Sequence, residues 1–320
     1  MSEDWAPGAS IELLRRRAAL LARIRGFFAE RDVLEVETPL LARRTVTDPH
    51  IDSFPVATPS GTRYLQTSPE FAMKRLLAAG IGDAYQICKA FRAEPAARLH
   101  NPEFSLLEWY RIGLDHHGLM DEVEALLRHI GADRSPTGPV CRLSYREAFV
   151  RYAGIDPFVA SDAECRVVAA AHGLDVTAPM SRGDWLDLLI GAVVAPAFDP
   201  GAYTFVYDFP ESQAALARVR VEDGHRVAER FELFHGSVEL ANGFHELIDA
   251  DEQRRRFERD RRARAAAGRE RPPMDEALLA AMVAGLPRSA GVALGLDRLL
   301  CALEGLEGLD QAISFAWERA

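Results

Sequence analysis

The stretch AYQICKAFRAEPAARLHNPEFSLLEWYR, residues 84–111, has two mainly apolar segments that flank a short loop. Residues 84–94 and 103–111 carry the aromatic and aliphatic side chains typical of strands. Residues 95–102 contain two prolines, which favour a loop. Because the loop is short, the two strands are expected to pair as a long antiparallel hairpin.

The charged residues of this hairpin suggest a binding surface. Arg92 and Glu94 are two residues apart, as are Glu108 and Tyr110, so each pair is expected to share one face of its strand. An arginine that faces a cleft can neutralise a phosphoryl oxygen through its rigid donor fork, whereas an Arg–Glu cross-strand pair is the alternative. The run His100–Pro102 could contact phosphate or form a simple turn, and the residues alone favour the turn.

Helices and strands are expected on both sides of the hairpin. A helix capped by Ser10 is followed by an alternating strand at 33–39, and a second helix starts after the sequence Thr67–Glu70. The other expected elements are helices at 119–130, 145–152, 184–194 and from Asp297, and strands at 204–210, 230–234, 238–242 and 291–296. This order predicts an α+β fold, an antiparallel sheet flanked by helices. We expect one domain over residues 1–320 with a mainly helical insertion at about 112–200.

The segment RFELFHGSVELANGFHEL, residues 230–247, reads as two strands and carries three glutamates, Glu232, Glu239 and Glu246. A two-residue turn at His235–Gly236 would place Glu232 directly opposite Glu239, where like charges repel. A hard cation such as Mg²⁺ between them would make the pair favourable; exposure of both to solvent is the alternative. Glu246 adds a third acid, and three acids near one arginine suit either a phosphate–metal site or a diamine.

Composition sets limits on the class of protein. The 320 residues include 38 Lys+Arg and 48 Asp+Glu, a net charge of −10, which disfavours nucleic acid as the main partner. The four cysteines lack metal-type or disulfide-framework spacing, and no export signal or membrane-spanning run is present. A cytoplasmic protein without membrane association is therefore expected. Neither a P-loop nor a GxGxxG turn occurs, so those two nucleotide sites are not supported.

Four segments in this order resemble the sequence motifs of the class II aminoacyl-tRNA synthetases, specifically the lysyl type. They are LEVETP (34–39), FRAE with RLHNPEFSLLEWY (91–110), ELANGFHEL (239–247) and GVALGLDR (291–298). Within this superfamily the chain looks most like the stand-alone paralogues that attach (R)-β-lysine to a lysine of elongation factor P. No oligonucleotide-binding barrel precedes the first helix, TFVYDFPESQAALA (204–217) reads like those paralogues, and Ala293 stands where lysyl-tRNA synthetases have glycine.

The resemblance implies a set of ATP-binding residues and a bound Mg²⁺. Arg92 would contact the α-phosphate and stabilise the charge that develops there, and Arg298 would lie beside the γ-phosphate. Both would be catalytic residues. Glu232 and Glu239 would hold Mg²⁺. The full implied ATP set is Arg92, Glu94 on the adenine amino group, His100, Asn101, Phe104 stacked on adenine, Glu239, Leu240, Gly295 and Arg298.

The resemblance also implies a site for a diamino acid. Glu70 and Glu108 would receive the amino group nearer the carboxylate, while Tyr110 and Glu246 would hold the distal ammonium. Buried acids matched to two ammonium groups avoid the cost of unpaired buried charge. The full implied substrate set is Ser68, Pro69, Glu70, Glu108, Tyr110, Asn242, Glu246 and Ala293.

The implied reaction has two steps, adenylate formation from ATP and the amino acid and then attack by a lysine amine of elongation factor P. Positioning and electrostatic stabilisation suffice, because no covalent enzyme intermediate is needed. Transfer to tRNA or to a small acceptor is an alternative, although the missing anticodon barrel and the acidic charge make tRNA an unlikely partner. A non-catalytic paralogue is a further alternative, opposed by the retained phosphate and metal residues.

Three further expectations concern the surface of the protein. The resemblance implies a homodimer formed through the LEVETP region. The segment 249–271 has nine Arg against six Asp+Glu and is interpreted as a solvated helix with paired charges, with a docking surface for an acidic protein as the alternative. His116 and His117 are expected at the surface.

Overall fold

The structure, a computed structural model, describes residues 5–131 and 140–320. The chain forms two compact units, one of Met1–Gly113 with Ile248–Ala320 and one of Leu114–Leu247. The helices expected at about 112–200 lie in the second unit. Both units are built on mostly antiparallel strands flanked by helices, which confirms the predicted α+β class.

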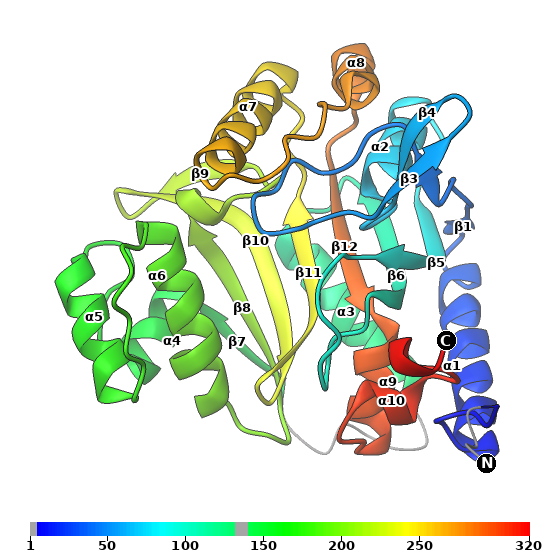
Figure 1. Cartoon of the computed structure of the whole chain (residues 1–320), viewed down its shortest axis with the longest axis horizontal. Coiled ribbons are helices and arrows are strands. Elements are labelled where there is room, and N and C mark those ends of the chain that lie inside the picture. The colour runs from blue at the N-terminus through cyan, green and yellow to red at the C-terminus, as the bar shows by residue number, and fades with distance from the viewer. Residues whose placement is uncertain (1–4, 132–139) are drawn as a thin grey trace. The chain divides into compact units, whose positions relative to one another are not determined.

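The main sheet of the first unit contains the predicted hairpin (Figure 1). Strands β5 (Ala84–Phe91) and β6 (Glu103–Ile112) pair antiparallel, and β12 (Ser289–Gly295) pairs antiparallel with β6. Strand β1 (Leu34–Glu35) pairs parallel with β5. A second sheet has the order β2 (Leu41–Ala42), β4 (Gly61–Leu65), β3 (Pro55–Thr58).

Two details of this sheet differ from the prediction. Strand β5 ends at Phe91, so Arg92 and Glu94 follow the strand instead of lying on it, because the two prolines of the connection end the ladder early. The strand expected at 33–39 is reduced to two residues. Leu34, an apolar residue of this alternating pattern, is 49% exposed.

Helix α1 (Ile11–Ala29) begins where the sequence predicts, since the Ser10 hydroxyl accepts a hydrogen bond from the Leu13 amide at 3.1 Å. It buries an apolar face whose Phe28 stacks on Tyr85 at 4.3 Å between ring centroids, an aromatic contact between helix and sheet. The other helices of this unit are α2 (Glu70–Ala78), α7 (Ala250–Ala266), α8 (Glu276–Gly285), α9 (Leu296–Glu304) and α10 (Leu309–Ala312).

A buried ion pair ties α1, α9 and β6 together. Arg17 lies 2.6 Å from Asp297, whose second carboxylate oxygen accepts the Ser105 amide at 2.7 Å. The carboxylate of Asp297 is therefore compensated by one cation and one backbone donor inside the core.

The second unit has strands in the order β11 (Val238–His245), β10 (His225–His235), β8 (Tyr203–Pro210), β7 (Val140–Ser144), with β9 (Val219–Glu222) on β10. Its helices are α3 (His116–Ile130), α4 (Tyr145–Tyr152), α5 (Asp162–Ala171) and α6 (Arg182–Leu189), and α6 continues as a π-helical turn over Ile190–Val194. Capping boxes begin α4, α5 and α6, and their apolar faces form one core with β8 and β10.

The charge-rich segment 249–271 is mostly helix α7, with ion pairs along its surface as expected, such as Arg255–Glu252 and Arg262–Glu258. Arg264, in contrast, is buried rather than solvated. Among the described residues, no helix combines the length and apolarity that crossing a membrane would need.

The Arg17–Asp297 pair gives a stability prediction. Arg17→Met should lower the free energy of unfolding by about 3–5 kcal/mol, because it leaves a buried carboxylate without its cation. Urea denaturation measures the change. Arg254→Met, which removes the exposed ion pair with Glu276, is the matched control and should leave the urea midpoint unchanged. Equal midpoints for the two variants would contradict the importance of the buried pair.

Candidate active site

A cluster of charged side chains lies in the first unit where α2 meets β6. Glu70 is the first residue of α2, and its carboxylate lies 2.6 Å from the ammonium of Lys74 one turn later. On β6, the Tyr110 hydroxyl donates to Glu108 at 2.8 Å, so these two side chains share a face as predicted. Ser68 accepts the Glu70 amide at 3.0 Å. The structure thus brings Ser68, Glu70, Glu108 and Tyr110 together. It adds Lys74, which was not predicted although the i,i+4 spacing to Glu70 was visible.

The carboxyl group of Glu108 is the most perturbed member of this cluster. Burial, reinforced by the negative charge of Glu70, raises the pKa of Glu108 to about 8, against the opposing effects of Tyr110, Ser68 and Lys74. Its Oε2 atom is buried and accepts no hydrogen bond from the described residues. An incoming ammonium group would supply both the missing donor and the missing positive charge.

Ala293 forms one wall of the same region. It pairs directly with Glu108 in the β6–β12 register, so the two side chains are neighbours on one face of the sheet. Gly291, two residues earlier, pairs with Tyr110. The small residues of GVALGL therefore lie against the polar residues of β6, in agreement with the expectation that this strand allows close approach.

The predicted phosphate-binding arginines are held by the loop between β5 and β6. Arg298, on the first turn of α9, donates to the Leu99 carbonyl at 3.1 Å and lies 2.9 Å from the His100 ring nitrogen. Arg92 has its guanidinium carbon 5.2 Å from the ring centroid of Phe104. The guanidinium groups are thus positioned by the loop and by an aromatic ring.

Asn101 has a structural role in this loop. Its amide nitrogen donates to the Glu103 carbonyl at 2.5 Å, and its amide oxygen accepts from the Trp317 backbone at 2.9 Å. These bonds fit the turn that the residues alone favoured.

The acidic strand pair of the second unit differs from the predicted register. His235 pairs with Val238, so the turn residues are Gly236 and Ser237 instead of His235 and Gly236. An irregularity after Leu233 places one extra residue on β11. Glu232 therefore lies opposite Asn242, and the prediction that it lies directly opposite Glu239 is wrong.

Glu239 is nevertheless close enough to act on Glu232. It pairs with Phe234, two residues along β10, and is thus a diagonal neighbour of Glu232 on the same face. Burial raises the pKa of Glu232 to about 8, and the charges of Glu239 and Asp187 add to this rise, while Arg230 opposes it. A divalent cation would stabilise the ionised form of such a carboxyl, so the donor set fits Mg²⁺.

Arg230, the arginine at the start of the segment 230–247, was given no specific partner in the prediction. Its guanidinium forms an ion pair with Glu232, donates to the Asn242 side chain at 3.1 Å and donates to the Gln213 carbonyl at 2.8 Å. The signal in the sequence was the i,i+2 spacing of Arg230 and Glu232 on one strand face. Glu246, the third predicted acid, directly follows β11 and is buried. Leu240 lies within β11 and is also buried.

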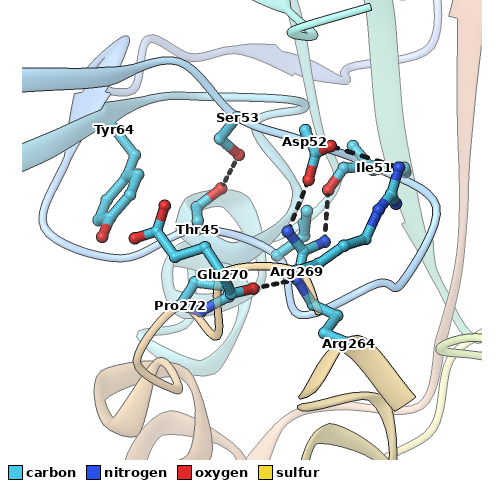
Figure 2. Close-up of a pocket in the computed structure, with 10 residues that line it drawn as sticks. Thr45, Ile51, Asp52, Ser53, Tyr64, Arg264, Arg269, Glu270 and Pro272 are labelled. Atoms are coloured by element: carbon cyan, nitrogen blue, oxygen red, sulfur yellow. Dashed lines mark hydrogen bonds and ion pairs between the residues drawn. The ribbon is translucent and has the colours of Figure 1, made fainter. Parts of the chain in front are cut away.

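A cavity of about 290 Å³ lies in the first unit between the loop that follows β2 and the end of α7 (Figure 2). The buried Arg264 donates there to the carbonyls of Asp48 and Ile51 and to the Asp52 carboxylate at 2.6 Å. The Asp52 carbonyl in turn accepts the amide of Ala93, the residue between Arg92 and Glu94, at 2.8 Å. Arg264 thus supports the backbone that carries the predicted nucleotide residues.

Comparison with known proteins gives the family. A family profile described as "tRNA synthetases class II (D, K and N)" matches residues 6–319. The chain belongs to this family. A curated relative from Edwardsiella ictaluri, named "Elongation factor P--(R)-beta-lysine ligase", is 48% identical over 99% of this chain and 98% of its own length. A relative of the same name from Salmonella typhi is 48% identical over the whole of both chains.

Family membership sets the chemistry. A class II synthetase domain is an ATP-dependent ligase, so the predicted fold, enzyme class and use of ATP are confirmed. The roles of the individual residues stay predictions, and the structure adds Lys74, Arg230 and Arg264 as their supports.

The raised pKa of Glu108 predicts that an ammonium ligand of this class II site releases a proton when it binds. At pH 7, below a pKa of about 8, the carboxyl is protonated in the free protein and ionises when the ammonium binds. Binding of L-lysine without ATP should therefore release about one proton, and the affinity should fall about tenfold per pH unit below 8. Calorimetry in buffers of different ionisation enthalpy measures the proton count.

Two variants separate this effect from other groups. Glu108→Gln should abolish the proton release, whereas Glu103→Gln, which alters an exposed acid on the same strand, should retain it. Proton release that persists in Glu108→Gln would show that another group titrates.

The cavity residues give a second prediction for the class II site. Arg264→Gln should raise KM for ATP about tenfold, which corresponds to about 1.4 kcal/mol, and should change kcat less, because it loosens the support of residues 92–94. Steady-state ATP–pyrophosphate exchange measures both constants. Arg262→Gln, an exposed change on the same helix, is the control, and equal KM values in the two variants would contradict the positioning role.

Proposed function

We propose that this chain activates (R)-β-lysine with ATP and transfers it to a lysine side chain of elongation factor P. The observation that carries this proposal is the cluster of Glu70, Lys74, Glu108 and Tyr110. It contains a buried carboxyl oxygen with no hydrogen bond from the described residues and a pKa raised by burial, beside a strand with Ala293. The names of the full-length relatives support the same substrate and acceptor.

In the first step, a carboxylate oxygen of the amino acid attacks the α-phosphorus of ATP and pyrophosphate leaves. We assign Arg92 to the α-phosphate and Arg298 to the γ-phosphate, where each compensates charge that develops on oxygen. Glu232 and Glu239 would hold Mg²⁺, which supplies positive charge to the phosphates when it is bound. The remaining contacts to ATP are assigned to Glu94, His100, Asn101, Phe104, Leu240 and Gly295.

In the second step, the neutral amine of the acceptor lysine attacks the carbonyl carbon of the mixed anhydride. An amide bond forms, AMP leaves, and the amine loses a proton. No residue of this chain becomes acylated, so its contribution is to position the reactants and to stabilise charge.

Two ammonium groups distinguish the proposed substrate from a monoamino acid. Glu70 and Glu108 would receive the group nearer the carboxylate, and Tyr110 with Glu246 the distal one. Because Lys74 already neutralises Glu70, a single added ammonium balances the ionised Glu108. Ser68, Pro69, Asn242 and Ala293 complete the proposed substrate contacts.

We also propose a homodimer in the cytoplasm. Four large apolar residues are between 39% and 49% exposed, namely Leu34, Leu40, Leu41 and Ile112. The first three lie in or just after LEVETP. Exposed apolar surface of this kind is typical of a protein–protein interface. All four cysteines are free thiols, which is consistent with a reducing compartment.

The leading test combines ATP–pyrophosphate exchange with mass measurement. Exchange should be faster with (R)-β-lysine than with α-lysine, and incubation should add one β-lysyl mass to elongation factor P and none to lysine tRNA. Arg298→Ala and Glu239→Gln should each lose exchange. A mass gain on tRNA alone would refute the acceptor, and undiminished exchange in both variants would refute the site assignment.

Ala293 gives a separate prediction on specificity. Because its side chain neighbours Glu108, Ala293→Gly should enlarge the pocket beside the carboxyl and improve the use of α-lysine relative to the β-isomer. The ratio of kcat/KM values for the two isomers measures the effect. An unchanged ratio would remove this residue from the specificity argument.

A further inference from the structure

A second group of side chains of the kinds that bind metals lies within the second unit. Glu229 on β10 and His245 on β11 are cross-strand neighbours, since Arg230 pairs with Phe244, and His245 Nδ1 lies 2.5 Å from the Glu229 carboxylate. The two acids of β10 have different partners, because Glu232 pairs with Arg230 whereas Glu229 lies beside His245.

Helix α3 contributes a third side chain to this group. It packs on both β10 and β11, and its first residue, His116, is buried, contrary to the expected surface position. One ligand atom from each of His116, Glu229 and His245 lies within 4.8 Å of the other two.

His116 is already oriented as a ligating histidine would be. Its Nε2 atom lies 3.0 Å from Asp208, which also accepts two 2.8 Å hydrogen bonds from Arg220. Asp208 is held in the left-handed region at φ 60°. The ion pair with Arg220 compensates the charge of this carboxylate. A histidine that binds a metal typically directs its other nitrogen to such a carboxylate.

The second ring nitrogen of His116 is the unusual feature. Nδ1 is buried and has no hydrogen-bond partner among the described residues. A buried polar atom without a partner is costly, and a cation would satisfy it. We propose that His116, Glu229 and His245 form a zinc site, with Asp208 as the positioning residue that fixes His116.

The ligand chemistry supports zinc over Mg²⁺. Two imidazoles and one carboxylate are a common donor set for Zn²⁺, with water in the fourth position, whereas Mg²⁺ prefers oxygen donors. The Glu229 carboxylate lies 2.5 Å from His245 Nδ1 and 3.8 Å from the Arg218 guanidinium. The exposed fraction of the Arg218 side chain, 41%, weakens its repulsion of a cation.

A second possible group is less suitable. His116, His117 and Asp208 also have ligand atoms within 4.8 Å of one another. Both oxygens of Asp208 already accept from Arg220, whose guanidinium would lie beside the metal. In the favoured site, zinc would join α3 to β10 and β11 and would take no part in adenylate formation, so the inference does not depend on the proposed function.

The test is zinc binding by the full-length chain after treatment with a chelator. Calorimetric titration should show one tight equivalent of Zn²⁺, and the thermal midpoint should rise with zinc, because the metal binds only the folded state. His245→Gln and Glu229→Gln should lose both effects. His117→Gln, the matched control beside His116, should keep both, and Asp208→Asn should weaken affinity about 10–100-fold.

Three results would overturn the proposal. They are the absence of tight zinc binding in the unaltered chain, retention of the zinc equivalent in a folded His245→Gln variant, and loss of the equivalent in His117→Gln. Circular dichroism establishes folding of each variant, and His245→Gln changes a partly exposed residue, so the test survives if Glu229→Gln fails to fold.

Discussion

The electrostatic cost of burying carboxylates shapes both units of this protein. An acid inside a folded chain must be paired with a cation, receive hydrogen bonds or keep its proton. Four buried or largely buried acids are paired with a cation from a nearby element or turn, namely Asp297 with Arg17, Glu232 with Arg230, Asp208 with Arg220 and Glu70 with Lys74. The Asp297 pair joins α9 to α1 and the Asp208 pair joins β8 to β9, whereas the other two pairs lie within β10 and α2. The Glu232 and Glu70 pairs also set the charge of the candidate site.

Glu108 is different because it keeps its proton when the site is empty. Burial favours the neutral carboxyl, and a hydrogen bond from Tyr110 holds its orientation. Ionisation is then coupled to the arrival of a cation, which makes recognition of an ammonium group a proton-exchange event. The same logic applies to Glu232, where the expected cation is a metal and Arg230 supplies only part of the compensation.

Local patterns in the sequence predicted the hairpin, the Ser10 cap and the strand–helix junction near Asp297, because periodicity and capping depend on neighbours in the chain. The register of β10 and β11 was mispredicted because the turn lies one residue later than expected and one extra residue on β11 then shifts the pairs beyond it. Lys74 was missed, and Arg230 was given no specific partner, because charged residues are usually solvated. Only tertiary packing shows that these two compensate buried acids. His116 was misplaced for the same reason, since its partner Asp208 is 92 residues away.

The Lys74–Glu70 pair affects how the protein folds in the absence of a ligand. A site of several uncompensated acids would depend on its ligand for folding, and the amount of folded protein would then follow the supply of that ligand. Because the ammonium of Lys74 already balances Glu70, this part of the site needs no ligand to compensate its charge, and its folding does not have to wait for one.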